Sequence, residues 1–293
     1  MKKTTTETAP AKINLTLDVT EKRADGFHNI KSIMHSLSLC DLLTLSAERA
    51  DKTEVTLEII GNRSLPTDRN NLVVKAVYTY LERIGESAIV EASLTKSIPA
   101  AAGLGGGSSD AAATLRAMNR LYNGRLSCEE LISLAAALGS DVPYCLVGGT
   151  ALCEGRGEIM TKINTSAKGV FVVAKGDDTV STPRAYAELD RIYSDFAAAN
   201  SVGTVKNEKM LASLSEGIIS PLYLYNIFED AAIPTCPSVA KIKELMSVSG
   251  ALGTLMSGSG PSVFGMFETK EKALNAEKKL RAEGYCAFVA ESI

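Results

Sequence analysis

Residues 103–110 read Gly-Leu-Gly-Gly-Gly-Ser-Ser-Asp, and they lie between a predicted strand at 89–98 and an alanine-rich helix predicted over 108–122. Glycine tolerates positive φ and lets successive backbone N–H groups converge on an anion, while the N-terminus of the following helix adds positive partial charge. A tight helix-entry turn would explain one or two glycines. Four glycines in five residues, followed by two hydroxyl side chains, favour a phosphate-binding loop.

This loop differs from the best-known nucleotide-binding motifs. No Gly-Lys-Ser/Thr follows it, as a Walker A sequence would require, and it matches G-x-G-x-x-G only in part. A dinucleotide-binding fold would also place an acid at the end of the next strand, whereas the nearest acid, Glu129, falls at a helix start. A dinucleotide-dependent oxidoreductase is therefore the weaker alternative.

The composition excludes several classes of protein. The chain has 293 residues, 31 Lys and Arg against 34 Asp and Glu, a net charge of −3 and 45% hydrophobic residues, which describe a globular protein of about two domains. Without a broad positive field, a nucleic-acid-binding module is disfavoured, and we expect no nucleic-acid partner. Six cysteines form no C-x-x-C pair and only two histidines are present, so we expect no metal cluster.

The N-terminus carries no targeting signal that the sequence reveals. Lys2 and Lys3 are followed by polar residues rather than an apolar signal region, and no apolar run approaches 18 residues. We expect a cytoplasmic protein that has no membrane partner and is a monomer or a weak homodimer.

Hydrophobic periodicity predicts an α+β chain. Strands are predicted at 11–19, 31–47, 53–60, 89–98, 150–154, 158–163, 169–175, 253–256, 263–267 and 285–290. Helices are predicted at 71–83, 108–122, 127–139, 182–193, 205–216, 237–247 and 270–283. Ser127 and Glu130 form a capping box that opens the third of these helices. We expect two domains, 1–155 and 156–293.

Three separate segments now point to one family. Residues 99–113, together with Pro-Ala-Lys-Ile-Asn at 10–14 and Met-Ser-Gly-Ser-Gly-Pro-Ser at 256–262, resemble the three motifs of the GHMP (galactokinase, homoserine, mevalonate, phosphomevalonate) kinases, in the same order. The resemblance covers residues 8–290. It implies a two-domain fold, with an N-terminal ATP-binding domain of ribosomal-protein-S5-like topology and a ferredoxin-like C-terminal domain that contributes to the substrate site.

Further features resemble one branch of that superfamily. Ala-Asp-Gly-Phe-His at 24–28, the triple-glycine form of the loop and Gly-Ser-Asp-Val-Pro at 139–143 are similar to kinases that act on a cytidine-diphosphate-linked methylerythritol. The resemblance implies transfer of the ATP γ-phosphoryl group, with Mg²⁺, to the tertiary 2-hydroxyl of this sugar alcohol in the non-mevalonate isoprenoid pathway. The alternative within the superfamily is a kinase of the homoserine or mevalonate type.

The resemblance assigns catalysis to Lys12 and Asp141 and substrate binding to Asn14. Lys12 and Asn14 lie two apart on a strand and hence on one face, opposite Ile13 and Leu15. Plain solvent exposure of that face would explain the pattern equally well. Asp141 aligns with the family's proposed general base, although it could simply cap the next short helix.

A second group of residues aligns with the family's cytidine site. Phe27 would stack on the base, where the family has tyrosine, and His28 would supply hydrogen bonds; a hairpin with one buried aromatic is the alternative. Thr182 and Tyr186 match the segment that covers the other face of the base.

The nucleotide site is assigned in the same way, with Asn71 and Leu72 at the adenosine and Lys96 near the nucleotide, unless Lys96 is merely an exposed lysine at a strand end. The remaining matching residues are Pro99, Gly103, Leu104, Gly105, Gly106, Gly107, Ser108, Ser109 and Asp110. Ser108 and Ser109 would meet phosphates or Mg²⁺, while Asp110 could act as a cap or an indirect metal partner. Ala101 and Ala102 stand where the family often has glycine, so backbone donors at these positions are in doubt.

Overall fold

The computed structural model describes residues 2–62, 64–193, 195–196 and 201–293. The chain forms two compact units, each built from separate segments. Unit 1 comprises Met1–Ala11, Cys40–Ala100 and Gly105–Val147, and unit 2 comprises Lys12–Leu39, Ala101–Leu104 and Gly148–Ile293.

Two long strands contribute to both units: β1 (Lys3–Lys22) and β2 (His28–Arg49). Their sheet has the strand order β3-β4-β2-β1-β8, with β5 paired to β2 and β6 paired to β5. Because each of these strands changes unit along its length, a single cut in the chain does not separate the units. The division into domains 1–155 and 156–293 stays a prediction.

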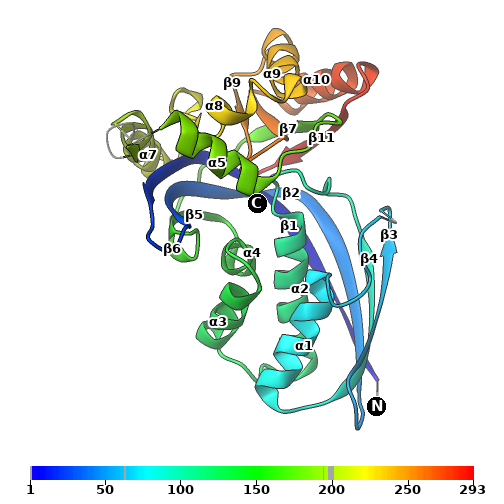
Figure 1. The fold of residues 1–293 in the computed structure, drawn as a ribbon. Helices are drawn as coiled ribbons and strands as arrows, with labels where there is room; N and C mark the ends of the chain where they lie inside the picture. Colours follow the sequence, from blue (N-terminus) through cyan, green and yellow to red (C-terminus); the bar gives the residue numbers. More distant parts are fainter. Residues whose placement is uncertain (1, 63, 194, 197–200) are drawn as a thin grey trace. The chain divides into compact units, whose positions relative to one another are not determined.

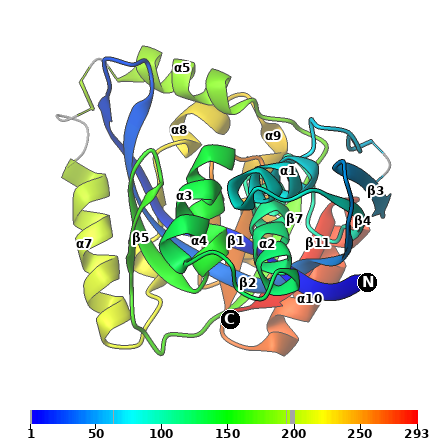
Figure 2. The same cartoon turned by 90° about the horizontal axis from the view of Figure 1, so that it is seen from below.

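Unit 1 packs four helices together with the C-terminal half of β2. Here β3 (Glu54–Ile60) pairs in parallel with β4 (Ala88–Thr95), which pairs antiparallel with Leu42–Arg49 of β2. Alternate residues of β4 are buried, as the period-2 pattern predicts. The helices, grouped together in Figure 2, are α1 (Leu72–Ile84), α2 (Gly106–Leu121), α3 (Cys128–Leu138) and α4 (Val142–Val147).

Local sequence explains where these helices begin and end. The Asn71 side chain accepts a hydrogen bond from the Val73 backbone N–H and starts α1, while Gly85, at φ 66°, ends it in the left-handed region that glycine favours. The predicted capping box of Ser127 and Glu130 is confirmed at the start of α3. Helix α2 begins two residues earlier than predicted.

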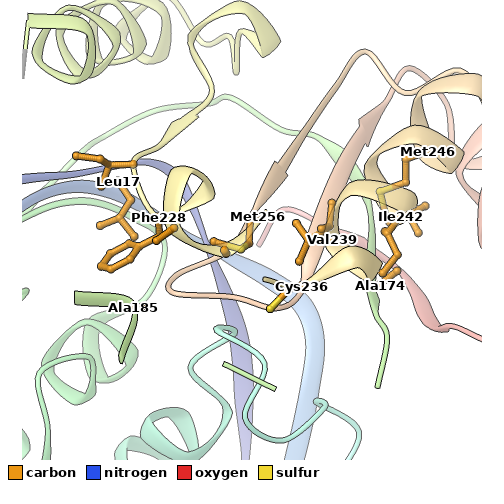
Figure 3. Packing of buried hydrophobic residues seen from close by; sticks show 14 of the residues in the cluster. Leu17, Ala174, Ala185, Phe228, Cys236, Val239, Ile242, Met246 and Met256 are labelled. Carbon is orange, nitrogen blue, oxygen red and sulfur yellow. The ribbon is translucent and has the colours of Figure 1, made fainter. Parts of the chain in front are cut away.

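Unit 2 contains an antiparallel sheet of order β11-β7-β10-β9, and Figure 1 shows α9 and α10 together on one side of it. Its strands are β7 (Val170–Lys175), β9 (Gly253–Met256), β10 (Val263–Phe267) and β11 (Cys286–Glu291). The helices are α5 (Thr182–Ile192), α7 (Ser201–Ser215), α8 (Glu229–Ala232), α9 (Pro237–Val248) and α10 (Lys270–Ala282), with a 3₁₀ turn η1 at Pro221–Tyr223. In Figure 3, Val239, Ile242 and Met246 of α9 lie in the apolar core with Ala174 of β7.

The other strands of unit 2 belong to the long sheet. They are β5 (Thr150–Gly155), β6 (Ile159–Lys162) and β8 (Tyr225–Asn226). Strand β5 pairs antiparallel with Ile30–His35 of β2, and β8 pairs in parallel with Thr16 and Leu17 of β1. The two-residue β8 and the short α8 were not predicted, because such short elements carry no periodicity. None of the helices in the described part of the chain is long and apolar enough to cross a membrane.

Candidate functional site

Lys12 and Asn14 sit on β1 with both side chains buried, 3% and 1% exposed. Solvent exposure, the alternative left open by the sequence, is therefore wrong. Lys12 Nζ donates a hydrogen bond to Asn14 Oδ1 (2.8 Å), and Asn14 Nδ2 donates to Ser32 Oγ (2.8 Å). A positioned ammonium suits a group that must stabilise negative charge.

The segment 256–262 packs against residues 101–104 within unit 2. Ser257 Oγ donates to the carbonyl oxygen of Gly103 (3.0 Å), and the Gly258 N–H donates to Asn14 Oδ1 (3.0 Å). A Cβ atom on Gly103 would overlap the Ser257 carbonyl oxygen and lie 3.0 Å from its carbon. The glycine thus permits two backbone segments to meet, and the Lys12 N–H donates to the Leu104 carbonyl (2.9 Å) beside them.

Ala101 takes up the left-handed conformation that glycine would adopt without strain. Its φ is 49°, one of two positive values found for non-glycine residues in the described part of the chain. Ala102 has no such value and is buried, while its carbonyl accepts a hydrogen bond from the Ser262 N–H (3.3 Å). The replacement of glycine by alanine therefore costs backbone strain at 101 alone.

The glycines at 105–107 open helix α2 in unit 1. Gly105, at φ 68°, is the N-cap residue, and no side chain in the described residues caps this end. The first N–H groups of a helix have no acceptor within it, so this turn presents unsatisfied donors and the positive end of the helix dipole. Gly107 is exposed and Ser108 is half-buried, which leaves room for an anion.

Lys96 lies beside the start of α2 with its side chain only 5% exposed, so the interpretation as an exposed strand-end lysine is wrong. Its Nζ donates to Asp110 Oδ2 (2.6 Å) and also bonds to the Asp41 carboxylate. A Cβ atom on Gly106 would lie 3.5 Å from this ammonium. Burial raises the pKa of Asp110 to about 7, with Lys96 opposing the shift and Asp41 adding to it.

Asp110 is therefore an ion-pair partner of Lys96, a role the sequence did not suggest. The backbone N–H groups of Ser97 and Ile98 donate to Asp41 Oδ1 (2.6 and 2.8 Å), so Asp41 fixes the end of β4 as well. Asp41 could have been identified from the sequence as an acid inside the apolar run of β2. Ser109 is fully buried, and its hydroxyl has no hydrogen-bond partner in the described structure.

The other residues assigned to the nucleotide lie in unit 1 near the same helix end. Leu72 Cδ1 would be 3.8 Å from a Cβ atom on Gly107, so the start of α1 lies beside the start of α2. Asn71 is occupied as a helix cap and donates from Nδ2 to the Pro66 carbonyl (2.8 Å). Pro99 is half-buried in the connection that follows β4.

Asp141 lies directly before α4 in unit 1 and is half-buried. Its carbonyl accepts the Cys145 N–H (3.0 Å), which closes the first turn of that helix. The role of its carboxylate, as general base or as helix cap, stays a prediction.

Phe27 projects from the turn between β1 and β2 and is 54% exposed, so it is not the buried aromatic of the hairpin alternative. The turn is closed by the Arg23 N–H, which donates to the Phe27 carbonyl (2.8 Å), and by Gly26 at φ 84°. The Arg156 guanidinium lies 5.0 Å from the centre of the Phe27 ring. An exposed aromatic ring on a hydrogen-bonded turn is a platform for a planar ligand.

His28, next in sequence, is buried, and its ring stacks on Tyr186 of α5 with 4.6 Å between centroids. Its Nε2 lies 2.8 Å from Asp190 Oδ1, and Lys22 Nζ lies 2.6 Å from Asp190 Oδ2. Burial alone would raise the pKa of Asp190, but hydrogen bonds from Lys22 and His28 outweigh it and lower that pKa. The ionised Asp190 can only accept, so Nε2 carries a proton in this contact, which fixes the orientation of the ring.

Asp190 is the residue that sequence reasoning missed here, since it lies 162 positions from His28. Thr182, exposed at the start of α5, exchanges a hydrogen bond with Ser259 Oγ (2.8 Å). The structure therefore groups Phe27, His28 and Tyr186 in unit 2 and joins the helix that carries Tyr186 to the 256–262 turn.

Comparison with known proteins identifies related chains over almost the whole length. Family models for the GHMP kinases N terminal domain and the GHMP kinases C terminal match residues 71–149 and 208–286. A 4-diphosphocytidyl-2-C-methyl-D-erythritol kinase of Caldicellulosiruptor saccharolyticus is 40% identical over 279 residues, which cover 93% of this chain and 91% of that protein. The enzyme of that name from Bacillus subtilis is 40% identical, with 96% and 93% covered.

Solved structures share the fold and confirm the predicted α+β two-domain class. A crystal structure of 4-(cytidine 5'-diphospho)-2C-methyl-D-erythritol kinase has a TM-score of 0.80 at 33% identity and covers 98% of this chain and 99% of its own. Homoserine kinase from Cytophaga hutchinsonii has a TM-score of 0.78 at 23% identity, covering 100% and 95%, and at this identity it supports the fold alone.

Proposed function

Because the chain belongs to the GHMP kinases, we propose that it transfers the γ-phosphoryl group of ATP to the 2-hydroxyl of 4-diphosphocytidyl-2-C-methyl-D-erythritol, in the non-mevalonate route to isoprenoids. The observation that carries the choice of acceptor is the Phe27–His28 hairpin. It presents an exposed ring beside a histidine whose ring nitrogens are oriented. Homoserine and mevalonate contain no base that would use these groups.

The nucleotide phosphates bind at the start of α2. The unsatisfied N–H groups after Gly105 and the helix dipole attract the phosphate oxygens, as at other helix N-termini that bind anions. Lys96 and Asp110 lie under this turn and hold it to β4, while Leu72 and Asn71 border the same helix end for the adenosine. The loop thus supplies positioning and charge neutralisation, which dominate phosphoryl transfer.

Mg²⁺ accompanies the phosphates of ATP, and the donors at this helix end suit it. The metal keeps several waters and prefers oxygen, so it is bound through phosphate and one or two protein oxygens rather than by a protein cage. The hydroxyl of Ser108, half-buried in the first turn of α2, is the oxygen that would hold it. When bound, the metal supplies charge neutralisation at the phosphates.

Lys12 and Asp141 act on the acceptor in this proposal. The carboxylate of Asp141 takes the proton of the attacking hydroxyl, and the Lys12 ammonium stabilises the negative charge that develops on oxygen. Asn14 holds Lys12 through Oδ1 and orients it.

The direct test is ADP release measured with the cytidyl substrate, homoserine and mevalonate in parallel at one ATP concentration. We expect turnover with the cytidyl substrate alone. Turnover with homoserine or mevalonate and none with the cytidyl substrate would overturn the assignment.

A variant tests the base site that carries the proposal. Phe27→Ala should raise KM for the cytidyl substrate about 5- to 150-fold, the range given by base–aromatic stacking of about 1–3 kcal/mol, and leave KM for ATP unchanged. Phe288→Ala is the matched control, because Phe288 also lies under an arginine guanidinium, 5.7 Å from Arg281, but on β11. An equal rise in both KM values for Phe27→Ala would mean that its ring only supports the fold.

A further inference from the structure

The orientation of one amide group contributes to the placement of the Lys12 ammonium. Lys12 Nζ donates to Asn14 Oδ1, and an amide turned by 180° would present NH₂ instead, which cannot accept a hydrogen bond from an ammonium. Whatever fixes the Asn14 amide therefore fixes the hydrogen bond that Asn14 accepts from Lys12.

From one side, the Asn14 amide is fixed by strand β2. Ser32 Oγ donates its only proton to the Thr16 carbonyl (2.7 Å), so toward Asn14 it can only accept. Asn14 Nδ2 meets that oxygen at 2.8 Å. This contact directs Nδ2 to Ser32 and Oδ1 to the opposite side.

From the other side, Asn14 Oδ1 accepts the Gly258 N–H (3.0 Å). Gly258 stands at φ 58° in the 256–262 turn, and Asn226 holds this turn through its Nδ2 atom. Asn226 Nδ2 donates to the carbonyls of Met256 (2.7 Å) and Gly258 (2.8 Å), while Oδ1 accepts the Phe228 N–H (3.0 Å).

Both polar side-chain atoms of Asn226 make hydrogen bonds, and the residue is 4% exposed. Asn226 lies on strand β8 and pairs with Leu17 of β1, the strand that also carries Lys12. The contact of Asn226 with the turn is therefore fixed relative to that strand. A series of buried hydrogen bonds joins Asn226 to the Gly258 carbonyl, and the N–H of the same residue continues it through Asn14 to the Lys12 ammonium.

We propose that Asn226 is a positioning residue that holds the Lys12 ammonium in place for phosphoryl transfer, acting through the Gly258 peptide and the Asn14 amide. The inference rests on the proposed function for the role of Lys12. Asn226 does not touch the reacting atoms. Its loss frees the Gly258 peptide to turn, removes a donor from Asn14 Oδ1 and lets the amide and the ammonium move together.

Kinetics of Asn226→Ala give the first test. We expect kcat to fall about 10- to 100-fold, the scale of a misplacement near 1 Å, while KM for ATP changes less than about 3-fold. Asn119→Ala is the matched control, since the Asn119 side chain also grips backbone, both the N–H and the carbonyl of Leu126 (3.0 and 3.1 Å), but at the far end of α2. It should lower stability and leave kcat unchanged.

A double-variant cycle separates positioning from general damage. If Asn226 acts through Lys12, adding Asn226→Ala to Lys12→Met should lower kcat by less than about 3-fold further, because the group it positions is already gone. A further loss as large as in the wild-type background would overturn the proposal. So would an unchanged kcat in folded Asn226→Ala protein.

A smaller change covers the outcome in which Asn226→Ala does not fold. Ser32→Ala removes the acceptor for Asn14 Nδ2 from the opposite strand and should lower kcat in the same way. Unaltered kcat in Ser32→Ala, together with an unfolded Asn226→Ala, would refute the series of hydrogen bonds.

A measurement without substrate keeps this inference distinct from the proposed function. The rate at which an amine-reactive reagent labels Lys12 reports its freedom directly, with exposed Lys52 as internal reference. Labelling of Lys12 should be faster in Asn226→Ala and in Ser32→Ala than in the wild type. Unchanged labelling overturns the positioning role, whereas an inactive wild-type enzyme with faster labelling in the variants overturns the proposed function alone.

Discussion

The contact between Gly103 and the 256–262 turn predicts a large penalty for a single methyl group. In Gly103→Ala the new Cβ would overlap the Ser257 carbonyl oxygen and lie 3.0 Å from Ser257 carbon and 3.3 Å from Gly260 nitrogen. All three atoms are backbone, so no side-chain rotation relieves the overlap. The residue must also hold φ 74°, which costs an alanine about 1–2 kcal/mol.

The energetic cost of the overlap adds to the cost of holding alanine at positive φ. Overpacking that forces backbone to move costs about 1–3 kcal/mol, so Gly103→Ala should lower the free energy of unfolding by roughly 2–5 kcal/mol. Gly284→Ala is the matched control in the same unit, because Gly284 has φ 88° and open space around the Cβ position. It should bear only the cost of holding alanine at positive φ, about 1–2 kcal/mol.

The assay is denaturant unfolding of both variants followed by circular dichroism, since the chain has no tryptophan to report by fluorescence. ADP release measured alongside should show a lower kcat for Gly103→Ala only, because displacement of the turn moves the Gly258 N–H that holds Asn14. The reasoning is refuted if the two variants unfold within about 0.5 kcal/mol of each other, the usual scatter of near-neutral changes.

Three further changes follow from the same structure. Asp141→Asn should lower kcat about 10²- to 10⁴-fold with KM for ATP nearly unchanged. The double variant with Lys12→Met should lose less kcat than the product of the two single losses. Near-normal kcat in Asp141→Asn when chemistry is rate-limiting would reject the base role. Gly106→Val should weaken ATP binding at least about 10-fold in a protein that remains folded by circular dichroism, because its side chain would press on Ile98 and Lys96 and shift the first turn of α2. Unchanged affinity measured by calorimetry would assign the loop to packing. Burial raises the pKa of Asp18 from an ordinary 3.8 to about 7. Between these two values the folded state keeps the proton and the unfolded state loses it, so the free energy of unfolding falls as pH rises from about 4 to 7. Denaturant unfolding of Asp18→Asn should therefore show a gain over the wild type of about 2–3 kcal/mol between pH 5 and pH 8, whereas the exposed Asp51→Asn should show none; parallel pH profiles for wild type and Asp18→Asn would contradict the assignment.

Local chemistry made much of the fold predictable. Asn71 and Gly85 set the limits of α1, and the Ser127–Glu130 capping box starts α3, because caps act over three or four residues and are written in the sequence. The predicted start of α2 was two residues late, since glycines at 106 and 107 were assigned to the loop although a helix tolerates them at its first turn.

Partners distant in sequence were not predictable. Asp41 and Asp110 meet at Lys96 because β2 and α2 each pack beside the end of β4, and neither acid is near the lysine in sequence. Asp190 reaches His28 from a helix 162 residues away. A sequence can mark an acid such as Asp41 as unusual within an apolar run, but it does not show which residue the acid pairs with, because the contact depends on how strands and helices pack rather than on spacing.

The polar face of β1 shows where pattern reasoning reaches its limit. Alternation places Lys12, Asn14, Thr16 and Asp18 on one side of the strand, and an alternating polar face ordinarily indicates solvent. Here that side is buried, with Asn207 of α7 accepting from Thr16 Oγ1 (2.6 Å) and Asp18 left without a hydrogen-bond partner in the described structure.

Burial of these groups carries a cost that an apolar strand would avoid. A buried amide or ammonium must keep its hydrogen bonds, and a buried carboxylate without partners raises its pKa instead. Lys12 and Asn14 meet that requirement through Ser32 and Gly258, from segments that lie far apart in the sequence. A strand that retains a lysine and an asparagine in such surroundings loses stability that leucine or valine would supply, so their presence there is better explained by the chemistry of phosphoryl transfer than by the fold.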